Sequence, residues 1–479
     1  MKALLSTCCV LLPLSLPTFS LAQTDFLIAD SAYYPSVSVD LLGRMHVGGN
    51  YLTSFPWMAF FVTLDSLGTR ALPRQDVGEP WAEDAVVVSG KYQNLQLWTL
   101  DRVQEWSTAL RGRLTSIDGD SLTPNETLGA EGKFGEAVWL SDSTFVVAWE
   151  EGDIPSEVKG EIGTLSAPFG AAPILVNDSS YLQSTKGLKH IATHEQADCF
   201  AVIWTQGVTA LDSLRLRFFS KSGVPLGSSI AVLPDSSHAP AAWPAIAMYP
   251  NGNVCIVWSA QSNAGQWNIY MRRISKAGTP LADAVVINNV PAARKAETEV
   301  AIDREGMAVV VWESAELPAQ RIRGQGFIPD GLPIGANFLA GNKADTIDQS
   351  EPVVAIRNGR TYAAWTEGSQ IRGTTFRFVP VGLATTTPTA RPQYASLDQN
   401  YPNPFNPSTT ILYTLSQRSH AVLTVFNTLG QQVATLVNES EEAGYHNVRF
   451  DGSGLATGVY FYRLQAGEYV ATKRLLLLR

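Results

Sequence analysis

The sequence is poor in charge, histidine and cysteine, and these shortages argue against several kinds of function. Only 16% of the 479 residues are charged, the net charge is −9, and no basic stripe is present, which argues against nucleic acid as a partner. Among the six histidines, His190 and His194 are four apart, but they precede a predicted strand, where this spacing does not converge on a metal. We predict no cofactor and no metal.

No apolar run is long enough to cross a membrane. The first residues combine Lys2, an apolar stretch over 3–16 and Ser20-Leu21-Ala22, which predicts a signal peptide over residues 1–22. Lipoprotein anchoring at Cys8 is a weaker alternative, because Thr7 is unsuitable before the cysteine.

Cysteine is scarce, because Cys8 and Cys9 leave with the predicted signal peptide and only Cys199 and Cys255 remain. Two cysteines in a long exported chain do not form a disulfide framework. The sequence leaves two alternatives for these cysteines, one disulfide bridge or two buried free thiols.

What the sequence has in abundance is one repeated apolar phrase. STFVVAW, DCFAVIW, GNVCIVW, GMAVVVW and GRTYAAW are copies of one element, YQNLQLW is a further copy, and GRMHVGG is a degenerate first one. The seven copies end 49 to 55 residues apart, at Gly49, Trp98, Trp149, Trp204, Trp258, Trp312 and Trp365. A period of about 50 residues is typical of a β-propeller.

Each repeat contains four short strand-like segments separated by Gly and Pro turns, as a propeller blade does. The last copy stops near residue 379 without a fourth strand, whereas residues 26–32 supply one before the first copy begins. A first strand that pairs with the last blade would close the ring and remove two exposed edges. We predict an all-β fold with a seven-bladed propeller over residues 24–379.

The composition then changes. Residues 380–396 are rich in Thr, Pro and Ala and predict an extended linker. Residues 397–479 contain strand-like runs with intervening turns, which indicate a small immunoglobulin-like β-sandwich.

The tail carries the phrases YPNPFNPST, VFNTLGQQVATL, GYHNVRFDGSGLATGVYFYRL and KRLLLLR. In these phrases it closely resembles the type A C-terminal sorting domain of the type IX secretion system, found in Bacteroidetes and relatives. The resemblance implies export by the Sec machinery, recognition by an outer-membrane translocon, and release or attachment to surface lipopolysaccharide. It also places the sorting signal in the final strands, at Gly458, Val459, Tyr460, Lys473, Arg474 and Arg479.

The propeller shows no catalytic motif: HExxH, GxSxG, CxxC, Walker, Rossmann and Asp-box patterns are absent. Four acids follow the repeat tryptophans, at Glu150, Glu151, Glu313 and Glu367, and they are candidates for an acid/base pair at one end of the ring. We interpret them as solvated turn residues, because two other copies have Thr205 and Ser259 there.

Tryptophans are of two kinds. The repeat tryptophans lie at a fixed phase within apolar strands, which favours packing between blades. The less regular ones are better candidates for an exposed binding surface: Trp57, Trp81, Trp106, Trp139, Trp243 and Trp267.

The main hypothesis is a non-catalytic exported propeller that binds a glycan, another ligand or a partner protein. The alternative is a carbohydrate-active hydrolase or lyase with its site at the propeller axis, and a third possibility is a scaffold. Carboxyl groups with raised pKa values that converge in the channel would favour the enzyme, whereas apolar plugs would exclude it.

Overall fold

The computed structural model forms two units, residues 1–381 and 382–479. In the part of the chain that it describes, every regular element is a β-strand, and none is a helix long and apolar enough to cross a membrane. The described residues are 19–20, 24–52, 57–65, 68–91, 93–102, 107–129, 132–152, 157–177, 183–184, 191–206, 213–233, 242–262, 266–289, 297–315, 319–341, 346–377, 379–380, 395–397, 400, 405, 407–442 and 444–478. The predicted signal peptide and linker lie mostly outside them.

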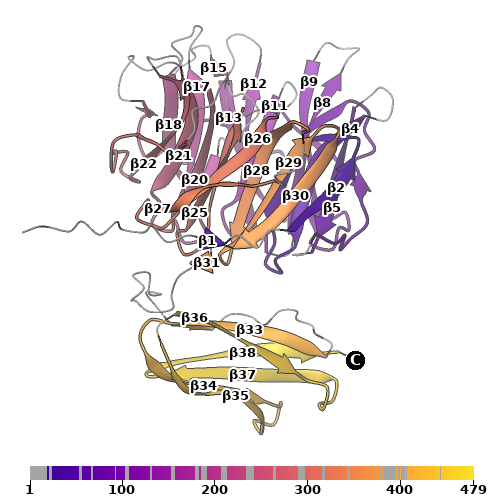
Figure 1. Ribbon diagram of the computed structural model, residues 1–479. Coiled ribbons are helices and arrows are strands. Elements are labelled where there is room, and N and C mark those ends of the chain that lie inside the picture. Colours follow the sequence, from indigo (N-terminus) through magenta and orange to yellow (C-terminus); the bar gives the residue numbers. More distant parts are fainter. Residues whose placement is uncertain are drawn as a thin grey trace, which may run out of the picture. The chain divides into compact units, whose positions relative to one another are not determined.

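Within the described residues, the first unit contains seven antiparallel sheets of four or five strands, which are the seven predicted blades (Figure 1). Blade 1 contains β3 (Ala32–Val39), β4 (Met45–Leu52), β5 (Trp57–Leu64) and β6 (Gln75–Asp76). Blade 2 contains β7 (Ala82–Ser89), β8 (Gln93–Arg102), β9 (Ser107–Ser116) and β10 (Glu126–Gly129). Blade 3 contains β11 (Gly132–Trp139), β12 (Thr144–Glu151), β13 (Glu157–Thr164) and β14 (Ile174–Leu175).

The other four blades repeat this order of strands. Blade 4 contains β16 (Ile191–Thr193), β17 (Cys199–Gln206), β18 (Ser213–Ser220) and β19 (Ile230–Ala231), and β15 (Gln183–Ser184) also pairs with β17. Blade 5 contains β20 (Ala242–Met248), β21 (Val254–Gln261), β22 (Trp267–Ile274) and β23 (Val285–Val286), and blade 6 contains β24 (Thr298–Ile302), β25 (Ala308–Ser314), β26 (Arg321–Phe327) and β27 (Pro333–Leu339). Blade 7 contains β28 (Gln349–Arg357), β29 (Arg360–Glu367), β30 (Gln370–Arg377) and β2 (Thr24–Asp30).

The ring closes as the sequence predicts. The N-terminal strand β2 pairs antiparallel with β30 and becomes the fourth strand of blade 7. The pair ends where Asp30 lies opposite Gln370, whose side-chain amide donates to Asp30 Oδ1 at 2.7 Å. The inner strand of blade 7, β28, also contacts β3 of blade 1. Two segments from opposite ends of the unit thus remove the edges that an open array would expose.

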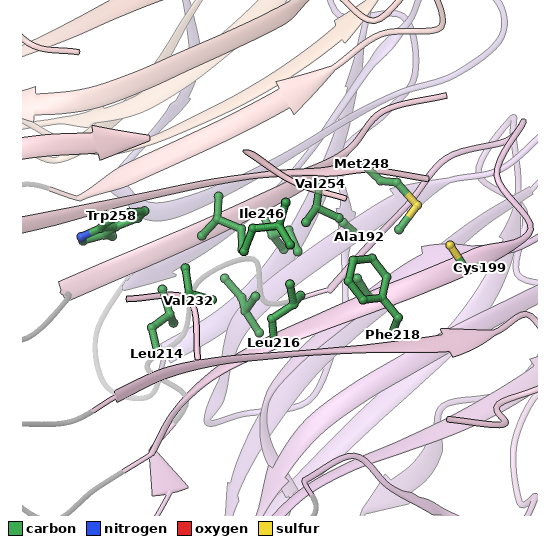
Figure 2. Close-up of a cluster of buried hydrophobic side chains, with 14 of the residues drawn as sticks. Ala192, Cys199, Leu214, Leu216, Phe218, Val232, Ile246, Met248, Val254 and Trp258 are labelled. Atoms are coloured by element: carbon green, nitrogen blue, oxygen red, sulfur yellow. The ribbon is translucent and has the colours of Figure 1, made fainter. Parts of the chain in front are cut away.

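The repeat tryptophans are buried between neighbouring blades, which confirms the prediction. Trp258 is 3% exposed and belongs to one cluster with Ile203 and Leu216 of blade 4 (Figure 2). Trp312 packs in the same way with Val257 of blade 5. Each tryptophan therefore fills the space between two sheets, and the unalternated apolar strands have both faces covered.

Cys199 and Cys255 are buried free thiols. Cys199 lies in the apolar layer between blades 4 and 5, whereas Cys255 lies in the layer between blades 5 and 6. Of the two alternatives that the sequence left open, the structure has the free thiols.

Blade 1 lacks the tryptophan because its place is occupied. A Cβ atom at Gly49 would lie 2.7 Å from Ile371 Cδ1 and 2.9 Å from Phe60 Cζ. Phe60, which is fully buried, and Ile371 of blade 7 fill the space between blades 7 and 1. The degenerate copy in blade 1 thus keeps this space filled, but the large side chain, Phe60, comes from β5 instead of β4.

The second unit is a sandwich of two sheets around one apolar core. One sheet has β32 (Ser396–Leu397), β33 (Ser408–Leu415) and β36 (Gly444–Asp451); the other has β35 (Gln432–Glu441), β34 (Ser419–Phe426), β37 (Gly458–Ala466) and β38 (Tyr469–Leu477). In the first unit, a separate short pair joins β1 (Phe19–Ser20) to β31 (Val379–Pro380).

Candidate functional site

The inner strands of the seven blades surround a central channel with a cavity volume of about 1190 Å³. Since each of these strands is the first of its blade, all seven run in the same direction along the axis. We call the end where they begin the N-terminal mouth and the end where they finish the C-terminal mouth. Small side chains line the wall between the mouths: Ser38, Val88, Val138, Ala192, Ala247, Ala301 and Ala355.

The inner strands share a distortion at the N-terminal mouth. Five of them contain a β-bulge, visible as a shift in register against the second strand. In each bulge one residue with a side chain has a positive φ, between 45° and 56°, at Tyr34, Asp84, Phe134, Trp243 and Glu351. Such a conformation costs about 1–3 kcal/mol and is concentrated at functional sites. All five residues line the channel.

Neighbouring blades hold several of these bulges in place. The Tyr34 amide donates to Glu351 Oε2 at 3.1 Å, and the Glu351 amide donates to Glu313 Oε1 at 2.9 Å. In blade 3, the Phe134 amide donates to Thr99 Oγ1 at 3.3 Å. Glu313 and Thr99 both directly follow a repeat tryptophan, so this position of the repeat supports the bulge of the next blade.

Carboxyl groups gather around Tyr34 at this mouth. Burial, the largest cause, raises the pKa of the Tyr34 phenol, and the charges of Glu351, Glu83, Asp84 and Glu297 raise it further. These acids belong to blades 2, 6 and 7, whereas Tyr34 belongs to blade 1, which lies between blades 7 and 2. We call Tyr34, Glu83, Asp84, Glu297 and Glu351 the carboxyl cluster.

The acids of the carboxyl cluster hold protons unusually tightly. Burial raises the pKa of Glu297 to about 8, and the neighbouring charges of Glu313 and Glu351 add to the effect. Burial and the nearby charges of acids also raise the pKa of Glu83 to about 7. Burial raises the pKa of Asp84 to about 6 and raises that of Glu351 as well. The cluster therefore contains both protonated and ionised carboxyl groups near neutral pH.

Aromatic rings adjoin the carboxyl cluster. Tyr34 is 52% exposed, and its ring centroid lies 6.3 Å from that of Trp57. Tyr33 meets Trp57 edge to face at 5.6 Å. Trp243 lines the same end of the channel from blade 5. Aromatic rings that are exposed or partly exposed beside carboxyl groups offer a stacking face and hydrogen-bond partners for a sugar ring.

The other tryptophan candidates have different positions. Trp139 packs on Phe145 with ring centroids 5.2 Å apart, and its indole N–H donates to the Val88 carbonyl at 3.0 Å. The Trp81 amide donates to the Trp57 carbonyl at 2.9 Å. Trp267 begins β22 and is partly exposed. Trp106 lies outside the described residues.

Three of the four acids after the repeat tryptophans are buried, and the fourth, Glu151, forms an ion pair. Glu150, Glu313 and Glu367 are only 5–8% exposed, so their interpretation as solvated turn residues is wrong. Glu367 Oε2 accepts hydrogen bonds from the Gln349 amide at 2.8 Å and the Trp365 indole at 3.3 Å. Glu151 accepts from the Trp149 indole at 2.8 Å and pairs with a lysine.

Sequence reasoning missed the carboxyl cluster, although a signal was present. In three copies the residue directly before the repeated proline is Tyr34, Trp243 or Glu351, so this position varies while its neighbours repeat. A variable polar or aromatic residue at a fixed place in a repeat is where a binding function is carried.

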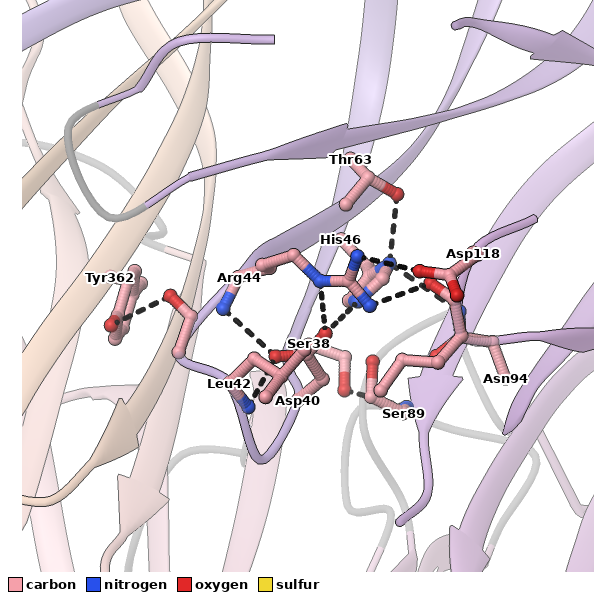
Figure 3. A network of polar contacts seen from close by, with 12 residues as sticks. Ser38, Asp40, Leu42, Arg44, His46, Thr63, Ser89, Asn94, Asp118 and Tyr362 are labelled. Atoms are coloured by element: carbon pink, nitrogen blue, oxygen red, sulfur yellow. Dashed lines mark hydrogen bonds and ion pairs between the residues drawn. The ribbon is translucent and has the colours of Figure 1, made fainter. Parts of the chain in front are cut away.

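The C-terminal mouth is built around buried charges. Asp40 is fully buried, and its Oδ2 accepts from Arg44 Nε at 2.7 Å and contacts His46 Nε2 at 3.0 Å (Figure 3). The other ring nitrogen of His46 contacts Thr63 Oγ1 at 3.0 Å. All three members of this Asp–His–Thr chain are at most 8% exposed, so the chain connects strands rather than meeting a ligand.

Only one member of the histidine pair lies within the described residues. His194 is 8% exposed, and burial lowers its pKa, while His190 lies outside those residues. The described part of the chain contains no group of three His, Cys, Asp or Glu side chains that could hold a metal ion.

In the tail, the predicted sorting residues occupy adjacent strands. Gly458, Val459 and Tyr460 begin β37 and pair with 475–477 of β38. Lys473 and Arg474 are exposed on β38, whereas Tyr460 is buried and donates to the Ala456 carbonyl at 2.8 Å. Arg479 lies outside the described residues.

Residues 399–477 match the family model of the secretion system C-terminal sorting domain. The tail is thus a type IX sorting domain, and the chain is exported to the cell surface or the extracellular space. No curated protein matches the chain in sequence.

Solved structures resemble the propeller in fold. One is an ulvan lyase of polysaccharide lyase family PL25 with bound -[GlcA(1-4)Rha3S]-, at 7% identity and TM-score 0.50, covering 73% of this chain and 95% of that one. Another is the β-propeller domain of the Trilobed protease from Pyrococcus furiosus, at 7% identity and TM-score 0.44, covering 72% and 95%. A third is polysaccharide lyase Uly1, at 9% identity and TM-score 0.46, covering 74% and 92%. At these identities the likeness concerns the fold alone.

Proposed function

We propose that the propeller is a carbohydrate-active hydrolase whose site is the N-terminal mouth, and that the sorting domain delivers it to the outside of the cell. The observation that carries the proposal is the carboxyl cluster around Tyr34. Glycoside hydrolysis needs one carboxyl group that holds a proton near neutral pH and a second that is ionised. The raised pKa values in the cluster support this division of roles.

Glu297 is the proposed general acid. Burial and two neighbouring carboxylates keep its proton in place up to about pH 8. Asp84, whose pKa of about 6 leaves it mainly ionised at neutral pH, is the proposed base or nucleophile. The phenol of Tyr34 is affected by the charges of both carboxyl groups, and its ring is exposed to the solvent, where it can orient a sugar.

The strained bulges support a functional reading of this mouth. Five residues with positive φ are held in place although each costs free energy, and the same position holds the aromatic and acidic side chains. The small side chains of the wall leave the channel open, with a cavity of about 1190 Å³, rather than plugged. The cluster therefore favours the enzyme over the non-catalytic propeller that was the main hypothesis from sequence.

The purified mature chain, incubated with a panel of neutral and acidic polysaccharides, tests the proposal. We expect new reducing ends, a loss of activity above about pH 8, and a decrease in kcat of about 100-fold or more in E297Q and D84N. The exposed acid Asp120, changed in D120N, is the matched control. Full activity in both variants would contradict the proposal.

A non-catalytic glycan-binding propeller is the second candidate, and the rings of Tyr33, Tyr34 and Trp57 favour it. It predicts saturable binding of a polysaccharide without cleavage, and weaker binding in W57A. Attachment of the propeller to surface lipopolysaccharide is a separate proposal, which a shift of the propeller to high apparent mass on gels of surface fractions would support.

A further inference from the structure

The C-terminal mouth of the channel carries most of the charges that line the cavity. Most of its residues end the inner strands or closely follow them, because the seven strands finish at the same end, whereas Lys221 follows β18, the third strand of blade 4. The cations that line it are Lys91, Lys221, Arg304 and Arg357, and the acids are Asp142, Glu195 and Asp303.

The acids of this mouth already have partners. Asp142 pairs with Lys91 at 2.6 Å, and Glu195 of blade 4 pairs with Arg304 of blade 6 at 3.1 Å. Asp303 accepts the backbone amides of residues 305 and 307 on Oδ1 and that of 359 on Oδ2.

Arg357, the last residue of β28, has no ion-pair partner among the described residues. Its side chain lines the cavity, and burial lowers its pKa, with the like charge of Arg304 adding to this. Glu195 and Asp40 attract it from a distance, but Arg304 and Arg44 hold those carboxylates. Its Nε is shielded from solvent and has no hydrogen-bond partner among the described residues. A partly buried guanidinium without an anion costs free energy, which a bound anion would recover.

We propose that the C-terminal mouth binds an oxyanion, a carboxylate or a sulfate group, on the guanidinium of Arg357. The planar fork of an arginine fits two oxygens of such a group and makes two parallel hydrogen bonds. Lys221 and Arg304 add positive potential at the same mouth. The oxyanion is either a free ion or the acidic group of a sugar, and this site lies at the opposite end of the channel from the carboxyl cluster.

Calorimetry on the full mature chain tests the site, with sodium sulfate, D-glucuronate and neutral D-glucose as probes. We expect saturable binding of sulfate or glucuronate, no binding of glucose, and an affinity lower by about tenfold or more in R357M. A preference for glucuronate over sulfate would assign the site to an acidic sugar, and the reverse order to a free inorganic ion. Lys276, an exposed lysine paired with Asp198, supplies the control variant K276M.

Equal affinity in the wild type and R357M, or no binding of either anion, would overturn the proposal. Because R357M could fail to fold, crystals of the wild-type chain grown with selenate provide a second measurement. Anomalous density beside the Arg357 guanidinium is expected, and its absence at saturating selenate would equally overturn the site. Neither measurement depends on catalytic activity, so the outcome is independent of the proposed hydrolase.

Discussion

The backbone amide of Tyr34 donates a hydrogen bond to Oε2 of Glu351 at 3.1 Å, across 317 positions of the sequence. The same oxygen accepts the Thr366 hydroxyl at 2.7 Å. Glu351 thus joins blade 7 to blade 1 at the N-terminal mouth, in addition to the closure by β2. It also belongs to the carboxyl cluster, so one side chain serves both the closure of the ring and the proposed chemistry.

Two substitutions of Glu351 should separate these roles. E351A removes the acceptor of two donors at a largely buried position, and we expect it to lower the free energy of unfolding by about 1–3 kcal/mol. E351Q keeps an acceptor oxygen, so it should cost less stability while changing the pH profile of any activity. Urea unfolding followed by tryptophan fluorescence measures the first effect, and D120A serves as the exposed control. Equal stability of E351A and the wild type would show that the contact between blades contributes nothing.

Stability should fall as the pH rises. A carboxyl group whose pKa is raised on folding binds its proton more tightly in the folded state, so its contribution is complete below the unfolded pKa. For Glu297 this contribution is lost between the ordinary value of 4.5 and about 8. We expect the urea midpoint to decrease over this window in the wild type, and to decrease less in E297Q. A pH dependence that is identical in E297Q and the wild type would contradict the raised pKa.

Gly49 provides a test of packing between the first and last blades. G49A places a Cβ within 3 Å of Ile371 and Phe60, so we expect a loss of about 1–3 kcal/mol from overpacking. Removing a methylene from the neighbour in G49A/I371V should recover part of the loss, because the closest atom is Ile371 Cδ1. I371V alone is the control for the cavity that it creates. Thermal unfolding of the three variants gives the coupling, and strict additivity would contradict the contact.

The fold could be predicted from the sequence because each copy of the repeat corresponds to one blade. The seven phrases ending at Gly49 or a tryptophan give the number of blades, and the unmatched strand at residues 26–32 gives the closure. Both depend on local patterns, since buried strands require apolar runs and edge strands require partners.

The site could not be predicted in the same way. Tyr34, Asp84, Glu297 and Glu351 come from four blades and meet only because the ring closes. Their raised pKa values depend on burial at the mouth, which no local pattern records. The acids after the tryptophans were misjudged for a related reason: Glu313 is buried because it supports the bulge of the next blade, a contact that the repeat alone does not reveal.

The sorting domain predicts where the chain goes, and two variants test how. Deletion of residues 398–479 should leave the protein in the periplasm of its native host, since the tail is the part that a type IX translocon recognises.

The exposed pair Lys473 and Arg474 lies on β38, beside the strand that begins with Gly458, so K473A/R474A should leave the sandwich core intact while reducing export about tenfold. R418A, which changes an exposed arginine of the tail outside β37 and β38, is the matched control. Immunoblots of periplasm, surface and medium measure the distribution. Unchanged export after the deletion would contradict the role of the tail, whereas unchanged export of K473A/R474A alone would place the signal elsewhere in it.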